Sequence, residues 1–120
     1  MKISYAIVFV SDMKRSTLFY NKVIGLPLRF ESPQWTEFAT DGDTLALHLS
    51  ISPVTCQVGH EVIPAGHCRP GLAVPDLNAF HSRMLEADVV CIEPPHNVHG
   101  SLVAQYLDPD GLSISVGESR

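Results

Sequence analysis

YAIVFVSDM at residues 5–13 returns in the second half of the chain as RPGLAVPDL at residues 69–77. In both stretches a short apolar strand ends at a valine, one residue follows, and an aspartate then stands where it can cap the start of a helix. An internal repeat determines architecture more firmly than local propensity does. The sequence therefore predicts two modules of the same design.

A helix is expected after each aspartate. The first should cover residues 13–24, with Gly25 as its C-terminal stop. The second should begin after Asp76 and end near Asp88, because apolar side chains recur there at helical spacing. These side chains are Leu77, Phe80, Met84 and Ala87.

Three extended segments follow each predicted helix, so that each module has the order βαβββ. The segments are residues 28–31, 35–39 and 44–50 in the first half, and residues 89–92, 102–107 and 112–116 in the second. The turns Asp41-Gly42-Asp43 and Asp108-Pro109-Asp110-Gly111 stand before the two last strands. A chain of 120 residues is long enough for one domain, which we divide into module 1–50, linker 51–66 and module 67–117.

Alternation along the strands predicts one face that is covered by the helix and one open face in each module. In residues 44–50, three leucines alternate with smaller or polar side chains that include Ala46 and His48. The fold class is therefore α+β, with tandem βαβββ modules forming a cupped mixed, mostly antiparallel sheet around a concave pocket.

Composition excludes two classes of partner. Eight Lys and Arg against 13 Asp and Glu give a net charge of −5, and the basic residues are scattered, so nucleic acid is not expected. The longest apolar run, residues 5–10, is too short to cross a membrane. The cysteines Cys56, Cys68 and Cys91 lack CxxC spacing, which favours free thiols and a cytoplasmic location.

The repeat resembles the vicinal oxygen chelate superfamily, whose members include glyoxalase I, extradiol dioxygenases, and fosfomycin- and bleomycin-resistance proteins. The resemblance rests on the motif Val-x-Asp-Met-x-x-Ser-x-x-Phe-Tyr from Val10 to Tyr20, on His99-Gly100, and on the turn at residues 108–111. It covers nearly the whole chain. It implies paired modules around a U-shaped pocket, commonly within a homodimer.

The resemblance also implies where a metal would bind, because metal-dependent members take four His or Glu ligands from the first and last strands of the modules. The matching positions here are Tyr5, His48, Arg69 and Ser115, of which only His48 is a good ligand. A phenol with a pKa of about 10 and a permanent guanidinium cation do not suit a metal. We therefore expect no metal cofactor. In the alternative, His48 joins His67 in a shifted ligand set that holds a divalent metal.

Two further histidines, His96 and His99, stand three residues apart in a segment that we interpret as a Pro-rich loop. Loop histidines at this spacing are expected to be solvated rather than to bind a metal.

The expected function is that of a bleomycin-resistance-like protein that binds a small organic molecule. The predicted ligand-binding residues are Tyr5, Phe9, Trp35, Glu37, His48, Arg69 and Ser115. Arg69 can hold a carboxylate or phosphonate, or can instead pair with Glu37 for structural reasons. Trp35 and Phe9 can stack on a flat ring, or Trp35 can be a partly covered sheet residue or lie in a dimer contact. Glu37 can instead attract a cationic ligand.

Catalysis stays open at this point, and no catalytic residue is assigned. The alternative function is that of a metal-dependent lyase, transferase or dioxygenase with a non-standard ligand set. In that case His48 would be a metal ligand or a general base instead of an ordinary pocket histidine.

Overall fold

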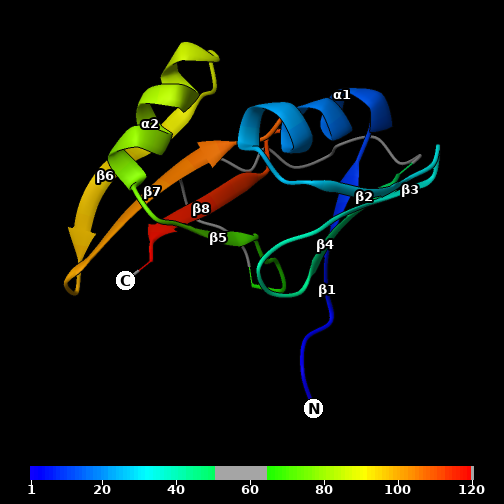
Figure 1. The fold of residues 1–120 in the computed structure, drawn as a ribbon, viewed down its shortest axis with the longest axis horizontal. Coiled ribbons are helices and arrows are strands. Elements are labelled where there is room, and N and C mark those ends of the chain that lie inside the picture. The colour runs from blue at the N-terminus through cyan, green and yellow to red at the C-terminus, as the bar shows by residue number, and fades with distance from the viewer. Residues whose placement is uncertain (51–64, 120) are drawn as a thin grey trace. The chain divides into compact units, whose positions relative to one another are not determined.

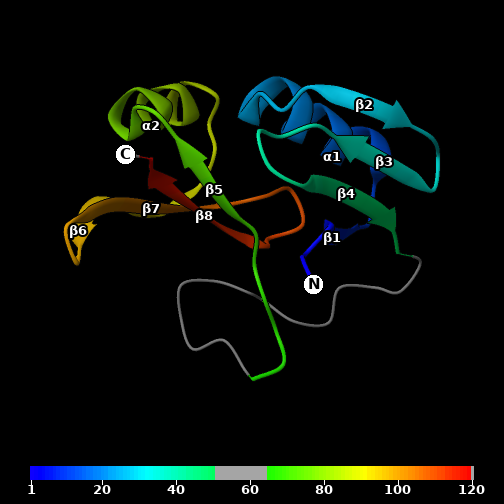
Figure 2. The ribbon, with the colours of Figure 1, turned by 60° about the horizontal axis from the view of Figure 1, so that its bottom comes forward.

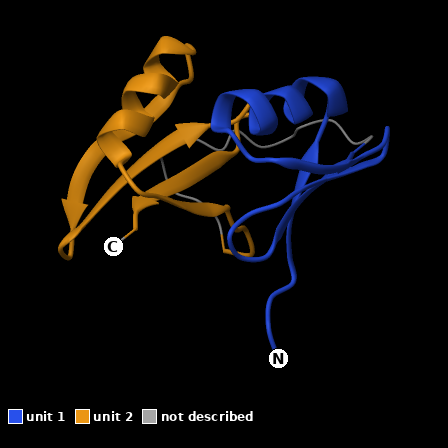
Figure 3. Cartoon of the chain, viewed as in Figure 1, with its two compact units in different colours: residues 1–55 blue, residues 56–120 orange. Residues whose placement is uncertain are grey.

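The chain forms two compact units, Met1–Thr55 and Cys56–Arg120, in a computed structural model that describes residues 1–50 and 65–119 (Figure 1). Figure 3 shows the two units in separate colours. Most of the predicted linker, residues 51–64, lies outside the described residues. Each unit has its own helical segment and its own four-stranded sheet.

The first unit has the predicted order βαβββ. Its sheet runs β1-β4-β3-β2, in which β1 is parallel to β4 and the other neighbours are antiparallel (Figure 2). The elements are β1 (Tyr5–Val10), α1 (Met13–Leu18), the π-helix η1 (Phe19–Ile24), β2 (Leu28–Glu31), β3 (Trp35–Phe38) and β4 (Thr44–Leu49).

The second unit repeats this arrangement. Its sheet runs β5-β8-β7-β6, again with one parallel pair, β5 and β8, and two antiparallel pairs. The elements are β5 (Gly71–Val74), α2 (Leu77–Glu86), β6 (Cys91–Val98), β7 (Ser101–Leu107) and β8 (Ser113–Glu118). The predicted α+β class, with tandem βαβββ modules and mixed, mostly antiparallel sheets, is confirmed.

Both helices begin at the aspartates that the repeat singled out. Asp12 Oδ1 accepts a hydrogen bond from the backbone N–H of Arg15 at 3.1 Å, and Asp76 Oδ1 accepts one from Ala79 at 3.0 Å. Each cap satisfies a donor that the first turn leaves without an intrahelical partner. The first predicted helix ends at Gly25 as expected, although its second half, residues 19–24, has π-helical hydrogen bonding.

The helices cover one face of each sheet, where the apolar core lies. In the first unit Val8, Val10, Leu45 and Leu47 are buried on this face. In the second unit the buried set consists of Leu77, Phe80, Met84, Ala104, Tyr106, Ile114 and Val116. The opposite face of each sheet carries the candidate site residues.

One predicted strand was too short. The segment that we placed at residues 89–92 is β6, which extends to Val98 and contains Pro94, Pro95 and His96. The interpretation of His96 as a loop residue was therefore wrong, whereas His99 lies in the turn between β6 and β7 with a φ of 50°. β6 tolerates prolines because it is an edge strand with two register shifts, so some of its N–H groups are not needed for pairing.

Over residues 1–50 and 65–119, no helix has the length and apolar character needed to cross a bilayer.

Candidate ligand-binding site

Four ring side chains gather on the open face of the first unit, and we call this group the ring row. Strand register brings them together, because Phe9 of β1 and Trp35 of β3 both pair with His48 of β4. The ring centroids of Phe9 and His48 are 5.3 Å apart, and those of Trp35 and His48 are 5.9 Å apart. The Tyr5 ring lies 6.0 Å from the Trp35 ring in an edge-to-face arrangement, which completes the row.

The ring row combines covered and exposed surface. Ala46 of β4 lies on the same open face, in register with Ile7 and Glu37. Its side chain is fully buried. Phe9 is 64% exposed and Tyr5 is 47% exposed. Aromatic surface of this kind, gathered on one sheet face, is typical of a binding surface rather than of a core.

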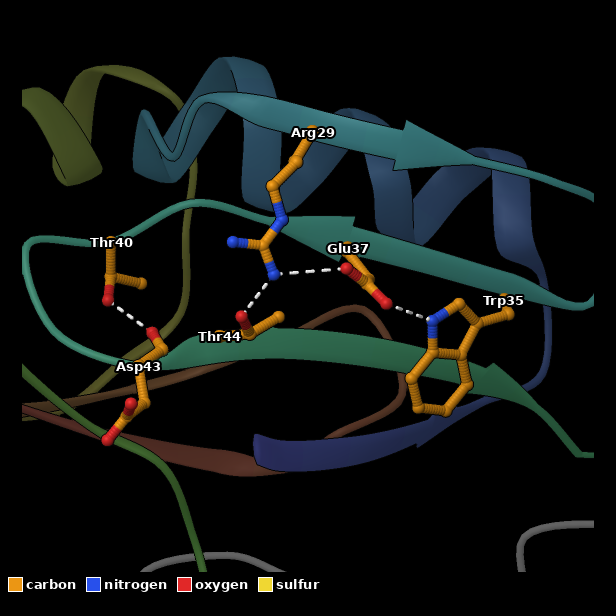
Figure 4. Close-up of polar contacts among 6 residues, drawn as sticks. All are labelled: Arg29, Trp35, Glu37, Thr40, Asp43 and Thr44. Atoms are coloured by element: carbon orange, nitrogen blue, oxygen red, sulfur yellow. Dashed lines mark hydrogen bonds and ion pairs between the residues drawn. The ribbon is translucent and has the colours of Figure 1, made fainter. Parts of the chain in front are cut away.

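A polar network fixes the indole of Trp35 (Figure 4). Trp35 Nε1 donates to Glu37 Oε2 at 2.8 Å, and Arg29 Nη2 donates to Glu37 Oε1 at 3.0 Å. Arg29 Nη2 also donates to Thr44 Oγ1. The hydrogen bond from Trp35, and secondly the one from Arg29, lower the pKa of Glu37, so that this carboxyl stays ionised.

The backbone of Trp35 is held as well. Its N–H donates to Ser32 Oγ at 3.0 Å, and the Ser32 hydroxyl donates to the Trp35 carbonyl at 2.6 Å. Hydroxyl bonds of this type fix tight turns. Trp35 is thus positioned at both its main chain and its ring before any ligand arrives.

His48 has a defined tautomer when its ring is neutral. Its Nδ1 lies 2.8 Å from the carbonyl oxygen of Leu49. Because a carbonyl only accepts, Nδ1 carries the proton and Nε2 keeps its lone pair. His48 can therefore accept a hydrogen bond from a ligand that stacks on its exposed ring.

The open face of the second unit is polar rather than aromatic. Arg69 Nη1 donates to Gln105 Oε1 at 3.0 Å, and the hydroxyl of Ser113 donates to the same oxygen at 3.1 Å. Ser115 pairs with Gln105 across β7 and β8 and is half-buried. This cluster offers guanidinium, amide and hydroxyl donors to an oxygen-bearing group.

The structure groups the predicted ligand-binding residues into two sets. Five of them meet on the open face of the first unit: Tyr5, Phe9, Trp35, Glu37 and His48. The other two belong to the second unit, where Arg69 lies two residues before the start of β5 and Ser115 lies in β8. Within the units, Glu37 is the ion-pair partner of Arg29, and Arg69 bonds to Gln105.

Sequence reasoning gave no role in the site to three polar residues of these faces, Arg29, Thr44 and Gln105. The alternation of β7 holds a signal for Gln105, which points away from the buried Ala104 and Tyr106. Arg29 gave no such signal, because β2 has a register shift between Leu28 and Phe30 that alternation cannot reveal.

Two βαβββ modules in tandem, each with a helix on one face of its sheet and aromatic or polar side chains on the other, define a class of α+β proteins. Residues 2–116 match the family model described as Glyoxalase/Bleomycin resistance protein/Dioxygenase superfamily. The chain belongs to this superfamily.

Solved structures share the fold of this chain. A protein of unknown function from Agrobacterium tumefaciens str. C58 is 26% identical, with 100% of this chain and 95% of that chain covered and a TM-score of 0.80. TnmS3, an antibiotic binding protein from Streptomyces sp. CB03234, is also 26% identical, with coverages of 100% and 97% and a TM-score of 0.74.

A lactoylglutathione lyase from Agrobacterium tumefaciens is 21% identical, with coverages of 98% and 93% and a TM-score of 0.75, and shows the fold alone. No curated protein sequence matches the chain.

The donor set at the metal positions of this family does not fit a divalent cation. Of Tyr5, His48, Arg69 and Ser115, one is an imidazole, and another is a permanent cation that donates to Gln105. Within the part of the chain that the structure describes, no three His, Cys, Asp or Glu side chains form a group able to hold a metal ion. His67, the residue of the shifted ligand set, is exposed in the segment before β5.

Proposed function

We propose that this protein binds a planar organic molecule on the ring row, without a metal ion. The single observation that carries this proposal is the ring row itself, in which Phe9 and Tyr5 expose aromatic surface beside a pre-positioned Trp35. Rings that are already ordered lose little conformational entropy when a flat ligand stacks on them. The description of TnmS3 as an antibiotic binding protein supports a small organic molecule as the ligand.

The second unit has its own part in the proposal. Arg69, Gln105 and Ser115 present donors on its open face, so we assign to them the recognition of a carboxylate or another oxygen-bearing group. Replacing Arg69 with alanine is expected to weaken the binding of acetate, a carboxylate without a ring, while the circular dichroism spectrum stays unchanged.

Titration with 2-naphthamide, followed by calorimetry, tests the ring row directly. Replacing Phe9 with alanine removes a stacking surface worth about 1.4 kcal/mol, so the affinity should fall about tenfold. Leu18→Ala is the matched control, because Leu18 is exposed to a similar extent, 59%, but lies on α1. Equal affinities in wild type and Phe9→Ala would contradict the proposal.

Elemental analysis tests the metal-free state. Protein purified without chelators and then dialysed should hold no stoichiometric nickel, zinc, iron or manganese. A metal retained at one equivalent per chain would overturn this part of the proposal.

One observation favours a second candidate function, that of a metal-dependent enzyme. His48 donates through Nδ1 to a carbonyl, which leaves Nε2 as the nitrogen that could bind a metal. If this candidate holds, His48→Ala should abolish both metal uptake and turnover, and retention of either would remove it.

We also propose that the protein is a cytoplasmic homodimer. The cysteines that the structure describes, Cys68 and Cys91, are free thiols, which supports a reducing compartment.

A further inference from the structure

Glu37 is the single acidic residue of β1, β3 and β4, the strands that carry the ring row. A carboxylate beside aromatic rings would ordinarily favour a planar cation, which the rings attract as well. The preference of the ring row therefore depends on whether this negative charge is free or neutralised.

Arg29 neutralises the negative charge of Glu37. The guanidinium lies 3.0 Å from Glu37 Oε1, while the Trp35 indole occupies Oε2 at 2.8 Å, so each carboxylate oxygen already has a donor. The Glu37 side chain is 21% exposed and that of Arg29 is 49% exposed, so the pair is partly open to solvent beside the rings. Arg29 is held further by its bond to Thr44 Oγ1.

We propose that Arg29 is a specificity-determining residue, which makes the ring row favour uncharged planar molecules by holding Glu37 in a closed ion pair. Glu37 is then a positioning residue for the Trp35 indole instead of a group that contacts a charged ligand. This inference rests on the proposed function, because it names the charge class of the molecule that the ring row binds.

The electrostatic part can be tested without any ligand, because Trp35 is the only tryptophan of the chain. Its fluorescence is quenched by caesium and by iodide, ions of opposite charge that report the local potential. In Arg29→Gln the ratio of the caesium to the iodide quenching constant should rise at least twofold. The double variant Arg29→Gln/Glu37→Gln should return the ratio to the wild-type value.

Arg15→Gln is the matched control, because it removes the same charge from α1 and not from this network. Its quenching ratio should stay near that of the wild type, and circular dichroism should show that all variants are folded. An unchanged ratio in Arg29→Gln, or an equal rise in Arg15→Gln, would overturn the role of Arg29.

Three probes of one shape test the ligand preference by calorimetry: 2-naphthamide is neutral, 2-naphthoate is anionic and 2-naphthylmethylammonium is cationic. Wild type should bind the amide more tightly than either the naphthoate or the ammonium ion. Arg29→Gln should improve the affinity for the ammonium ion about fivefold relative to the amide, and the double variant should lose that gain.

The outcomes separate the two proposals. If the amide binds and Arg29→Gln leaves the ranking unchanged, the inference on Arg29 is wrong and the proposed function stands. If none of the probes binds to any variant, the proposed function fails and the specificity inference fails with it, whereas the quenching ratio still decides whether Arg29 masks Glu37.

Discussion

At the scale of the residue, several polar atoms are paired where sequence alone gives no partner. Tyr106 is fully buried against Phe80, with ring centroids 5.7 Å apart, and its hydroxyl lies 2.9 Å from His81 Nδ1. The ring row could be predicted, because strand alternation fixes which side chains share a face. The partners of Glu37 and Arg69 could not, because they depend on side-chain reach across strands.

Burial, with a smaller contribution from Cys91, raises the pKa of Tyr106 to about 12 from 10.0. The folded protein therefore holds this proton more tightly than the unfolded chain does, and stability should be complete below pH 10 and be lost as the pH rises toward 12. Thermal unfolding between pH 8 and 12 measures this loss.

Tyr106→Phe is the control for this titration. It removes the hydroxyl and its bond to His81, which costs about 1 kcal/mol at neutral pH, but it should flatten the decline above pH 10. The same alkaline decline in wild type and Tyr106→Phe would show that another group is responsible.

For Glu37 the pKa is shifted in the opposite direction, so we expect a loss of stability at acid pH. Its pKa lies below the ordinary value of 4.5, first because of the Trp35 hydrogen bond and then because of Arg29. The stabilisation is therefore present above pH 4.5 and should be lost as the pH falls through the lower folded value. Trp35 emission should change with a midpoint below 4.5 in wild type and show no such step in Glu37→Gln. A midpoint at or above 4.5 would refute the assignment.

At the scale of the element, the repeat predicted both helices and most strands, because caps, apolar spacing and turn residues all indicated the same boundaries. β6 was the exception. Pro94 and Pro95 were interpreted as signs of a loop, although an edge strand with register shifts accommodates them. Whether a strand lies at an edge is a property of the sheet order, which the local sequence of residues 91–98 does not contain.

The turn before β8 offers an element-scale prediction. Asp108 is buried, and its Oδ1 accepts hydrogen bonds from the N–H groups of Asp110 and Leu112, both at 2.9 Å, while Gly111 takes a φ of 84°. Asp108→Ala would leave two partly buried donors without this partner and should lower the free energy of unfolding by about 1 to 2 kcal/mol. Urea denaturation measures this change.

Asp41→Ala is the matched control, because Asp41 belongs to the equivalent turn of the first unit and is exposed. It should change stability by less than about 0.5 kcal/mol. Equal losses in the two variants would mean that Asp108 has no special role in its turn.

At the scale of the whole molecule, the two units share one topology but carry different chemistry on their open faces. The first has rings with a masked carboxylate, and the second has a donor cluster around Gln105. The βαβββ scaffold is thus common to both units, whereas the side chains on their open faces differ. The sequence indicates this scaffold strongly and the binding chemistry only in part.

The proposed homodimer is tested at this scale. Apolar side chains are exposed in the first unit, including Ile7 at 46% and Phe30 at 53%, which is surface that a second chain can cover. Sedimentation equilibrium at micromolar concentration should give twice the mass of one chain. A single-chain mass across the whole concentration range would contradict the dimer.

The prolines of β6 have a consequence for how this protein behaves when it is concentrated. β6 forms the outer edge of its sheet, and Pro94 and Pro95 offer no N–H groups to an incoming strand, while the neighbouring register shifts disturb the regular spacing of the others. Sheet extension through this edge, the route by which many β-rich proteins aggregate into fibrils, is therefore disfavoured by the covalent structure of the strand itself.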